Sequence, residues 1–407
     1  MPLNHFRFIT VILCLPLILN AAELDTIHSS ALVIDAHADI EIPGQESRYV
    51  GADGKSQVAP EKMRTGGVDA VVMSIAVGPG PRTAEGRQQA QIRANAELNA
   101  VVDMIAFSGN KLLMARTATD VRNAHNNQQI AIILGLQNAR IFDNQLDEID
   151  RFYELGVRVF ALTHMGHNDY ADSSRPIFIR ELGEHEPLEE HGGLSNLGRS
   201  AITRINSLGA IVDISQLSKN AALQAMELSS APVIASHSNV RGLTDVSRNL
   251  SDEELDALAL NGGVVHIAPF RGYLYDSNNP DLDSDIRTIR RASGIKEEYL
   301  YPFELYWEID DIQTQQAFLS AVSDRLGQGS IAAMVNHIDY VVQRIGIDHV
   351  GIGTDFNHGS GVAGFSDASQ AKNVTAELLS RGYSASAIEK IWGGNFLRVM
   401  EAAAASD

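Results

Sequence analysis

Eight short apolar runs, separated mostly by segments of helical periodicity, constrain the fold of this chain more than any other feature. The runs lie at residues 32–40, 68–77, 130–136, 157–162, 210–214, 232–235, 263–268 and 350–354. Continuous apolar runs of this length are typical of strands buried on both faces of a parallel sheet. Helical patterns lie between most of them, at residues 83–107, 147–155, 195–208, 219–228 and 252–261. Eight strand–helix units predict an α/β fold, a single-domain (β/α)8 barrel of the TIM type.

The main alternative for this alternation is a doubly wound open sheet. That architecture usually places a glycine-rich phosphate loop directly after its first strand. Residues 41–61, which follow the first apolar run, are polar and contain glycine and proline, but they contain no such loop. The chain also has no sequence repeat and no low-complexity linker that would divide it. The closed barrel is therefore the preferred prediction.

Residues 1–22 predict a secretory signal peptide. Arg7 precedes an apolar core at residues 8–19, and the small residues Ala21 and Ala22 follow it. A positive residue, an apolar core and small residues in this order are the marks of a cleavable signal. The core is short for a transmembrane helix. We therefore expect the segment to be removed after export.

Composition limits the partners and the chemistry of the mature chain, residues 23–407. The formal net charge of -19 argues against nucleic acid or an anionic membrane surface as a partner. Cys14 is the only cysteine and lies inside the predicted signal, so the mature chain would hold no disulfide and no thiolate. No other apolar run is long enough to span a bilayer. These features predict a secreted, periplasmic protein.

Residues 269–330 are longer than a connection between two barrel elements requires. They carry the aromatic residues Tyr273, Tyr275, Tyr299, Tyr301, Phe303, Tyr306 and Trp307. We expect an inserted segment with helices before the last strand, near the mouth of the site or at a subunit contact. An irregular surface excursion is the alternative.

Polar side chains suited to metal or proton chemistry follow the carboxyl ends of six predicted strands. They are His37 with Asp39, Gln137, His164, Gln216, His237 and Asp355. In a (β/α)8 barrel these ends meet at one mouth, where the active site is built. Imidazole and carboxylate groups are ligands that zinc accepts. One such pair at a strand end is often only a satisfied polar contact, but the recurrence predicts a metal-dependent site.

Several short motifs coincide with these strand ends. They are Asp35-Ala36-His37-Ala38-Asp39, Leu162-Thr163-His164 with Ala171-Asp172-Ser173, Ser236-His237-Ser238, Ser247-Arg248-Asn249, His337-Ile338-Asp339-Tyr340, and His349-Val350-Gly351-Ile352-Gly353-Thr354-Asp355-Phe356. With these motifs the chain resembles the renal (membrane) dipeptidase family, the M19 metallopeptidases of the amidohydrolase-like barrels. The resemblance runs from about residue 33 to residue 399. Each motif alone is weak, whereas their combination is specific.

The resemblance implies a dipeptidase with two zinc ions that are bridged by a carboxylate and a hydroxide. Such enzymes cleave small dipeptides, often with a D-residue at the C-terminal position. By this resemblance His37, Asp39 and Asp355 would bind the first metal, and His237 would bind the second. The family also suggests a homodimer.

The same resemblance implies roles in catalysis and substrate binding. His164 would contact the substrate and stabilise the oxygen of the tetrahedral intermediate. Arg248 would bind the substrate carboxylate, and Asp355 would take the proton from the attacking water. A guanidinium also pairs well with structural carboxylates, so a structural ion pair is the alternative role of Arg248.

Two positions depart from the family's pattern. Its bridging glutamate falls on Gln137, and a histidine ligand of its second metal falls on Gln216. An amide oxygen carries no charge and is a poor zinc ligand beside carboxylate or imidazole. We therefore expect one tightly bound ion, with a weak second position where Gln137 is an uncharged ligand beside His237. The alternative is a hydrogen-bonded wall formed by these three side chains.

Two further histidines, His167 and His358, lie close to motif positions. Either could supplement the metal site, although histidines in loops are more often solvated. Two other functions also stay open. One is a different reaction on the same barrel, such as deamination or the hydrolysis of another amide or a lactone. The other is a binding protein that has lost the metal centre, for which Gln137 and Gln216 argue.

Overall fold

The computed structural model describes residues 21–405 with the exception of residues 48, 52, 180–181 and 295–310. The predicted signal peptide lies outside the described residues apart from Ala21 and Ala22, which begin helix α1. No helix within the described ranges is both long enough and apolar enough to cross a membrane.

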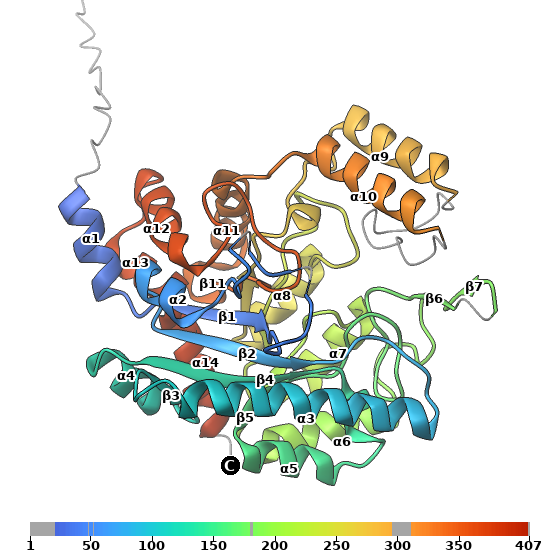
Figure 1. The fold of residues 1–407 in the computed structure, drawn as a ribbon, viewed down its shortest axis with the longest axis horizontal. Coiled ribbons are helices and arrows are strands. Elements are labelled where there is room, and N and C mark those ends of the chain that lie inside the picture. Colours follow the sequence, from blue (N-terminus) through green and yellow to red (C-terminus); the bar gives the residue numbers. More distant parts are fainter. Residues whose placement is uncertain (1–20, 48, 52, 180–181, 295–310, 406–407) are drawn as a thin grey trace, which may run out of the picture.

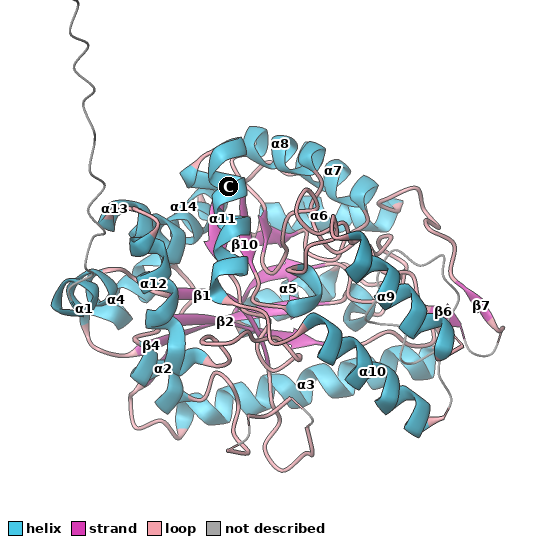
Figure 2. Cartoon of the chain, turned by 90° about the horizontal axis from the view of Figure 1, so that it is seen from above, coloured by secondary structure: helices cyan, strands magenta, loops and turns pink. Residues whose placement is uncertain are grey.

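Eight parallel strands form the centre of the molecule (Figures 1 and 2). In spatial order they are β1 (Ile34–Asp39), β2 (Ala70–Ala76), β4 (Ile130–Gln137), β5 (Val157–Ala161), β8 (Ile211–Asp213), β9 (Ile234–Ala235), β10 (Val264–Ile267) and β11 (Val350–Ile352). All neighbouring pairs in this order are parallel. Each strand falls on one of the eight predicted apolar runs.

The last strand returns to the first. Ala38 forms a parallel bridge with Phe356 just beyond β11. The amide of Asp39 donates to the Phe356 carbonyl at 2.9 Å, and the amide of Asp355 donates to the His37 carbonyl at 2.9 Å. The sheet is therefore a nearly closed (β/α)8 barrel of the TIM type, and the doubly wound open sheet was the wrong alternative.

Helices surround the barrel (Figure 2). The five predicted ones are α3 (Ala84–Ala106), α5 (Asp147–Leu155), α6 (Asn196–Ser207), α7 (Lys219–Leu228) and α8 (Asp252–Asn261). Their ends follow the sequence signals. Ser251 caps α8 in a capping box with Glu254, and α5 ends at Gly156, whose φ of 115° suits glycine.

Other elements were not predicted individually. They are the helices α1 (Ala21–Ser30), α2 (Pro60–Gly66), α4 (Ala118–Asn126), α11 (Ile331–Ile345), α12 (Ala371–Ser380), α13 (Ala385–Glu389) and α14 (Asn395–Ala404), the short helices η1 (Ala139–Phe142), η2 (Arg271–Tyr273), η4 (Ile347–His349), η5 (Ala368–Gln370) and η6 (Lys390–Gly394), and the strands β3 (Leu112–Met114), β6 (Phe178–Ile179) and β7 (Glu184–His185). Strand β3 pairs in parallel with β4 outside the barrel order, and β6 and β7 form a hairpin. Strands of two or three residues are too short to show a periodicity.

The predicted insertion at residues 269–330 contains two helices, α9 (Pro280–Ala292) and α10 (Ile312–Leu326). They pack against each other and project from the barrel (Figure 1). Of its aromatic residues, Tyr273 and Tyr275 are described, and those from residue 299 to residue 307 lie outside the described residues.

Two buried carboxylates fix the carboxyl ends of neighbouring strands. Asp35 on β1 accepts from the Thr354 amide at 2.8 Å and from the Thr354 hydroxyl at 2.6 Å, beyond β11. Asp213 on β8 accepts from the amides of Ser215 and Ser236 at 2.9 and 3.0 Å. Because both carboxylates are at most 4% exposed, these hydrogen bonds hold the residues that follow the strands in fixed positions.

Candidate metal centre and active site

The barrel brings the predicted residues to one mouth. Three of them, His37, His237 and Asp355, each place one possible ligand atom in a common cluster. These three atoms all lie within 4.8 Å of one another. The rings of His37 and His237 are stacked with centroids 3.8 Å apart. His37 lies in β1, whereas His237 and Asp355 follow β9 and β11, so only the closed barrel makes them neighbours.

His37 and Asp39 present two buried polar atoms to each other as an ion pair, and neither atom makes a hydrogen bond of good geometry. These atoms are His37 Nε2 and Asp39 Oδ1, and they lie 3.3 Å apart. Asp355 Oδ1 lies 4.0 Å from the same nitrogen. An imidazole nitrogen with a carboxylate oxygen on either side suits a divalent cation, and His237 completes the group of ligand atoms around His37 and Asp355. The donor set therefore fits the metal that the motifs imply.

The charges of this cluster are strongly coupled. Burial disfavours the His37 cation, but the Asp39 and Asp355 carboxylates outweigh it and raise the pKa of His37. Burial, with Asp39 nearby, raises the pKa of Asp355. Burial also tends to raise the pKa of Asp39. The neighbouring His358 and His37 have the larger effect and hold the pKa of Asp39 well below its usual range. Asp39 is therefore the permanent anion of the cluster, and Asp355 is the carboxylate that accepts a proton more readily.

His358 is bound to a metal-site carboxylate. Its Nδ1 lies 2.7 Å from Asp39 Oδ2, and its ring stacks on Tyr49 at a centroid distance of 5.3 Å. Burial lowers the pKa of His358, but the Asp39 carboxylate raises it by more. The net effect is a pKa of about 9. A histidine in this position orients the carboxylate for the cation.

The two glutamines surround His237. Gln137 Nε2 lies 3.3 Å and Gln216 Nε2 lies 3.2 Å from His237 Nε2. All three side chains are buried. These contacts match the hydrogen-bonded wall that was the sequence-based alternative to a second metal position. Gln216 has a φ of 68°, a left-handed backbone conformation that is uncommon for a residue other than glycine.

Ser236 and Asp213 support both histidines, and sequence reasoning assigned them no role. Ser236 Oγ lies 2.7 Å from His237 Nδ1 and 3.3 Å from His37 Nδ1, and it donates to Asp213 Oδ2 at 2.5 Å. The signal in the sequence was weak, because Ser236 and Asp213 both stand beside motif residues but are 23 positions apart. Only the pairing of β8 with β9 brings them together.

His164 lies above the cluster and lines a cavity of about 510 Å³ together with Asp39 and His358. Its ring meets that of His358 edge-on with centroids 5.3 Å apart. Burial and the nearby cations hold the pKa of His164 well below its ordinary value, so its imidazole is neutral at pH 7. Its Nδ1 is buried without a hydrogen-bond partner. A neutral imidazole can donate one N–H to an oxygen of a bound molecule.

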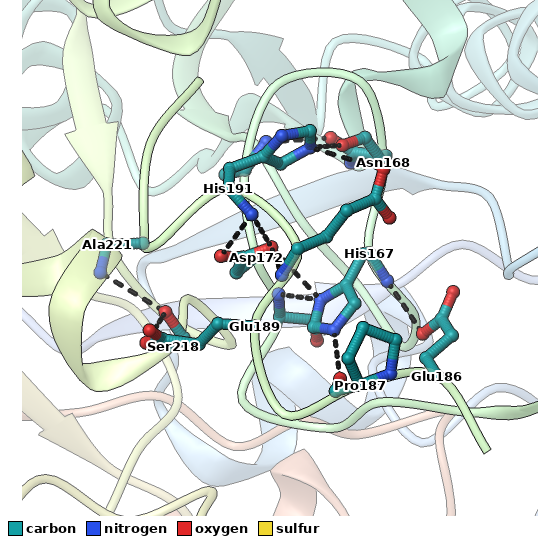
Figure 3. A network of polar contacts seen from close by, with 12 residues as sticks. His167, Asn168, Asp172, Glu186, Pro187, Glu189, His191, Ser218 and Ala221 are labelled. Atoms are coloured by element: carbon teal, nitrogen blue, oxygen red, sulfur yellow. Dashed lines mark hydrogen bonds and ion pairs between the residues drawn. The ribbon is translucent and has the colours of Figure 1, made fainter.

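The other histidine, His167, supports the loop that carries His164 (Figure 3). Its Nε2 lies 2.7 Å from the Pro187 carbonyl, and its Nδ1 accepts from the Ser173 amide at 3.0 Å. Asp172, also buried, accepts from the amides of residues 190, 191 and 193. Both ring nitrogens of His167 are therefore engaged within the loop, and neither is available for a metal.

Arg248 is buried beside the wall. Its guanidinium donates to the Ser238 hydroxyl at 3.1 Å and to the His237 carbonyl at 2.9 Å, and it lies 5.2 Å from the centre of the Tyr273 ring. Its Nε has no hydrogen-bond partner. None of these contacts of Arg248 with described residues is made to a carboxylate, so they give no support to the structural ion pair considered for it. A buried cation without a counter-charge suits an anionic group of a ligand.

Known proteins are similar to this chain in sequence and in fold. The chain is 30% identical over 307 residues to "Dipeptidase aclJ" of Aspergillus oryzae, a match that covers 75% of this chain and 59% of that protein. The chain thus spans less than two thirds of the length of that relative.

Solved structures match over most of both chains. The probable dipeptidase PvdM from Pseudomonas aeruginosa is 32% identical with a TM-score of 0.82, over 95% of this chain and 98% of that chain. A metallo peptidase from Rhodobacter sphaeroides, liganded with a phosphinate mimic of the dipeptide L-Ala-D-Ala, is 21% identical with a TM-score of 0.70, over 92% and 99% of the two chains. This second likeness concerns the fold alone.

A family model described as "Membrane dipeptidase (Peptidase family M19)" matches residues 21–407. The match covers nearly the whole chain, including every strand of the barrel and every residue of the cluster described above. The protein therefore belongs to the membrane dipeptidase family, peptidase family M19.

Proposed function

We propose that the protein is a metal-dependent dipeptidase that hydrolyses the peptide bond of small dipeptides, including those with a D-residue at the C-terminal position. Membership of the metallopeptidase family supports this proposal. The observation that carries it is the buried nitrogen His37 Nε2, which has Asp39 Oδ1 at 3.3 Å and Asp355 Oδ1 at 4.0 Å. An imidazole and two carboxylates are sufficient ligands for a catalytic ion that keeps an open position.

The ion would be zinc, held by His37, Asp39 and Asp355. When bound, it supplies Lewis acidity that lowers the pKa of a water molecule and polarises a carbonyl oxygen. His237 is less suited to a second ion, because the amides of Gln137 and Gln216 already contact its Nε2. We therefore expect one firmly held ion and a weak second position.

The residues of the chain would then divide the remaining tasks. Asp355, whose pKa is raised by burial, takes the proton of the attacking water as general base. Neutral His164 donates a hydrogen bond to the oxygen of the tetrahedral intermediate. Arg248 binds the terminal carboxylate of the dipeptide, because its buried guanidinium has no ion-pair partner among the described residues.

We further propose that the chain is exported through a signal at residues 1–22 and acts in the periplasm as a homodimer. The apolar run and the small residues of the leader support export. Family membership is the only support for the dimer. Cell fractionation and the mass of the purified protein in solution test these two points separately.

The proposed activity is tested with protein purified without chelator and a panel of L,L- and L,D-dipeptides. We expect hydrolysis that is lost on metal removal and in the variant Asp355→Asn, which retains shape but removes the base. Lactones and amino-purines serve as substrates for the competing reactions. Turnover of these compounds without cleavage of any dipeptide would overturn the proposal, and no turnover together with no bound metal would favour a binding protein.

A further inference from the structure

A chain of hydrogen bonds with a fixed direction runs through the position of the second metal. It begins at Asp213, a carboxylate that is 1% exposed and can only accept hydrogen bonds. The Ser236 hydroxyl, which carries one proton, donates it to Asp213 at 2.5 Å. Its oxygen can then only accept from the imidazole nitrogens beside it. His237 Nδ1, at 2.7 Å, is therefore the protonated nitrogen of that ring.

The same order of donors and acceptors extends to the two glutamines beside His237. The other nitrogen, His237 Nε2, contacts the amide nitrogens of Gln137 and Gln216, at 3.3 and 3.2 Å. Amide nitrogens are donors, so Nε2 must be the acceptor of this contact. Each glutamine that donates here directs its carbonyl oxygen away from His237. The chain thus ends in amide carbonyl oxygens, which are acceptors.

Gln216 is the end of the chain that lacks a partner. Its Oε1 is buried and has no hydrogen bond, and the residue is only 5% exposed. A buried carbonyl oxygen without a donor is unfavourable, because it has lost its hydrogen bonds to water and gained none in the protein. The φ of 68° adds backbone strain at the same residue. The unpartnered oxygen is the feature that points to a ligand, because a hydrogen-bond donor on a bound molecule would satisfy it.

We propose that the Gln216 carbonyl oxygen binds the free amino group of the substrate, so that a neutral acceptor occupies the place of a second metal. This inference rests on the proposed dipeptidase activity and names the group that selects its substrates. A dipeptide has three polar parts outside the leaving N–H. Its carboxylate requires a cation, for which Arg248 is suited, and its scissile carbonyl requires a donor, for which His164 is suited. Its terminal ammonium requires an acceptor, which Gln216 provides.

The test uses binding, because binding is measured whether or not a substrate is turned over. The probes are a phosphinate analogue of Ala-Ala and the same compound without its amino group, titrated calorimetrically into the metal-loaded protein. We expect the parent to bind the amino form about 10-fold more tightly or better, as for one hydrogen bond to a charged group. In Gln216→Met this preference should fall to about 2-fold or less, with the binding of the second compound unchanged.

Gln137→Met is the matched control, because it removes the other amide beside His237 and should keep the preference for the amino form. Metal content is measured for each variant, and Gln216→Met should retain the ion of the parent. An undiminished preference in Gln216→Met, an equal loss in Gln137→Met, or no preference in the parent would overturn the inference. Failure of the dipeptidase proposal is seen separately, as absent hydrolysis of Ala-Ala.

Discussion

His358 Nδ1 lies 2.7 Å from Asp39 Oδ2, so a histidine that follows the last barrel strand is paired with a carboxylate that ends the first. Sequence reasoning considered His358 as an extra metal ligand or a solvated residue. Its contact with Asp39 instead gives it a supporting position, in which it fixes one oxygen of the carboxylate while the other faces His37. The pair also joins the two strands at which the barrel closes.

The first prediction concerns the pH dependence of this pair. The pKa of His358 is raised from 6.5 to about 9 in the folded protein. The stabilisation by the pair is therefore fully present below pH 6.5 and is lost as the pH rises through about 9. In metal-depleted protein, the free energy of unfolding of the parent relative to His358→Phe should decrease by roughly 1–3 kcal/mol across this range. Urea unfolding at several pH values measures it, and parallel curves for the two proteins would contradict the prediction.

The second prediction concerns metal content. Protein purified without chelator should carry about one ion per chain, because His37 with Asp39 and Asp355 is the position, among the described residues, where an imidazole meets two carboxylates. Asp39→Ala should lose the ion, since it removes a charged ligand. His237→Ala should retain most of it, because the His237 nitrogens already contact Ser236 and the two amides. Elemental analysis of the three proteins decides, and loss of the ion in His237→Ala would make His237 a ligand of the first metal.

The third prediction reverses the two departures from the family pattern. The double variant Gln137→Glu with Gln216→His adds one charge and one strong ligand beside His237. Its metal content should rise from about one toward two ions per chain. The single variants should show smaller increases, because each restores only one ligand. Two ions already present in the unmodified protein would show that the amides coordinate more strongly than this argument allows.

The fourth prediction concerns Arg248. Arg248→Met should lower kcat/KM for dipeptides by an amount that corresponds to roughly 2–4 kcal/mol, as when a buried charge loses its partner. Dipeptides with an amidated C-terminus should be poor substrates of the parent and should lose little more in the variant. Kinetics with free and amidated forms give both values. Equal turnover of the two forms by the parent would assign Arg248 to structure, where it holds Ser238 and the His237 carbonyl.

The fifth prediction separates His167 from the metal site. His167→Leu removes the ring contacts with the Pro187 carbonyl and the Ser173 amide. The variant should be less stable by roughly 1–3 kcal/mol, because the buried Ser173 amide loses its acceptor, whereas the Pro187 carbonyl belongs to an exposed residue. Its metal content should equal that of the parent. Thermal unfolding and elemental analysis measure the two effects, and loss of the ion without loss of stability would identify His167 as a ligand.

The sequence by itself determined the architecture and the kind of chemistry. Strand and helix periodicity are local properties, because each apolar run carries its own burial pattern. The eight runs therefore predicted the eight barrel strands, and the position of His37, His164, His237 and Asp355 after those strands predicted a common mouth. The sequence also shows that Gln137 and Gln216 differ from the family pattern, because each places an amide where the family has a carboxylate or an imidazole.

Only the tertiary structure decided how the side chains divide the work. Ser236 reaches His37 across 199 positions of the chain, and His358 reaches Asp39 across 319. His167 and His358 look alike in sequence, but one is held inside its own loop and the other is paired with a carboxylate of the metal centre. These roles depend on strand register, barrel closure and loop conformation. Those features are set by packing between distant segments, so no local pattern in the sequence contains them.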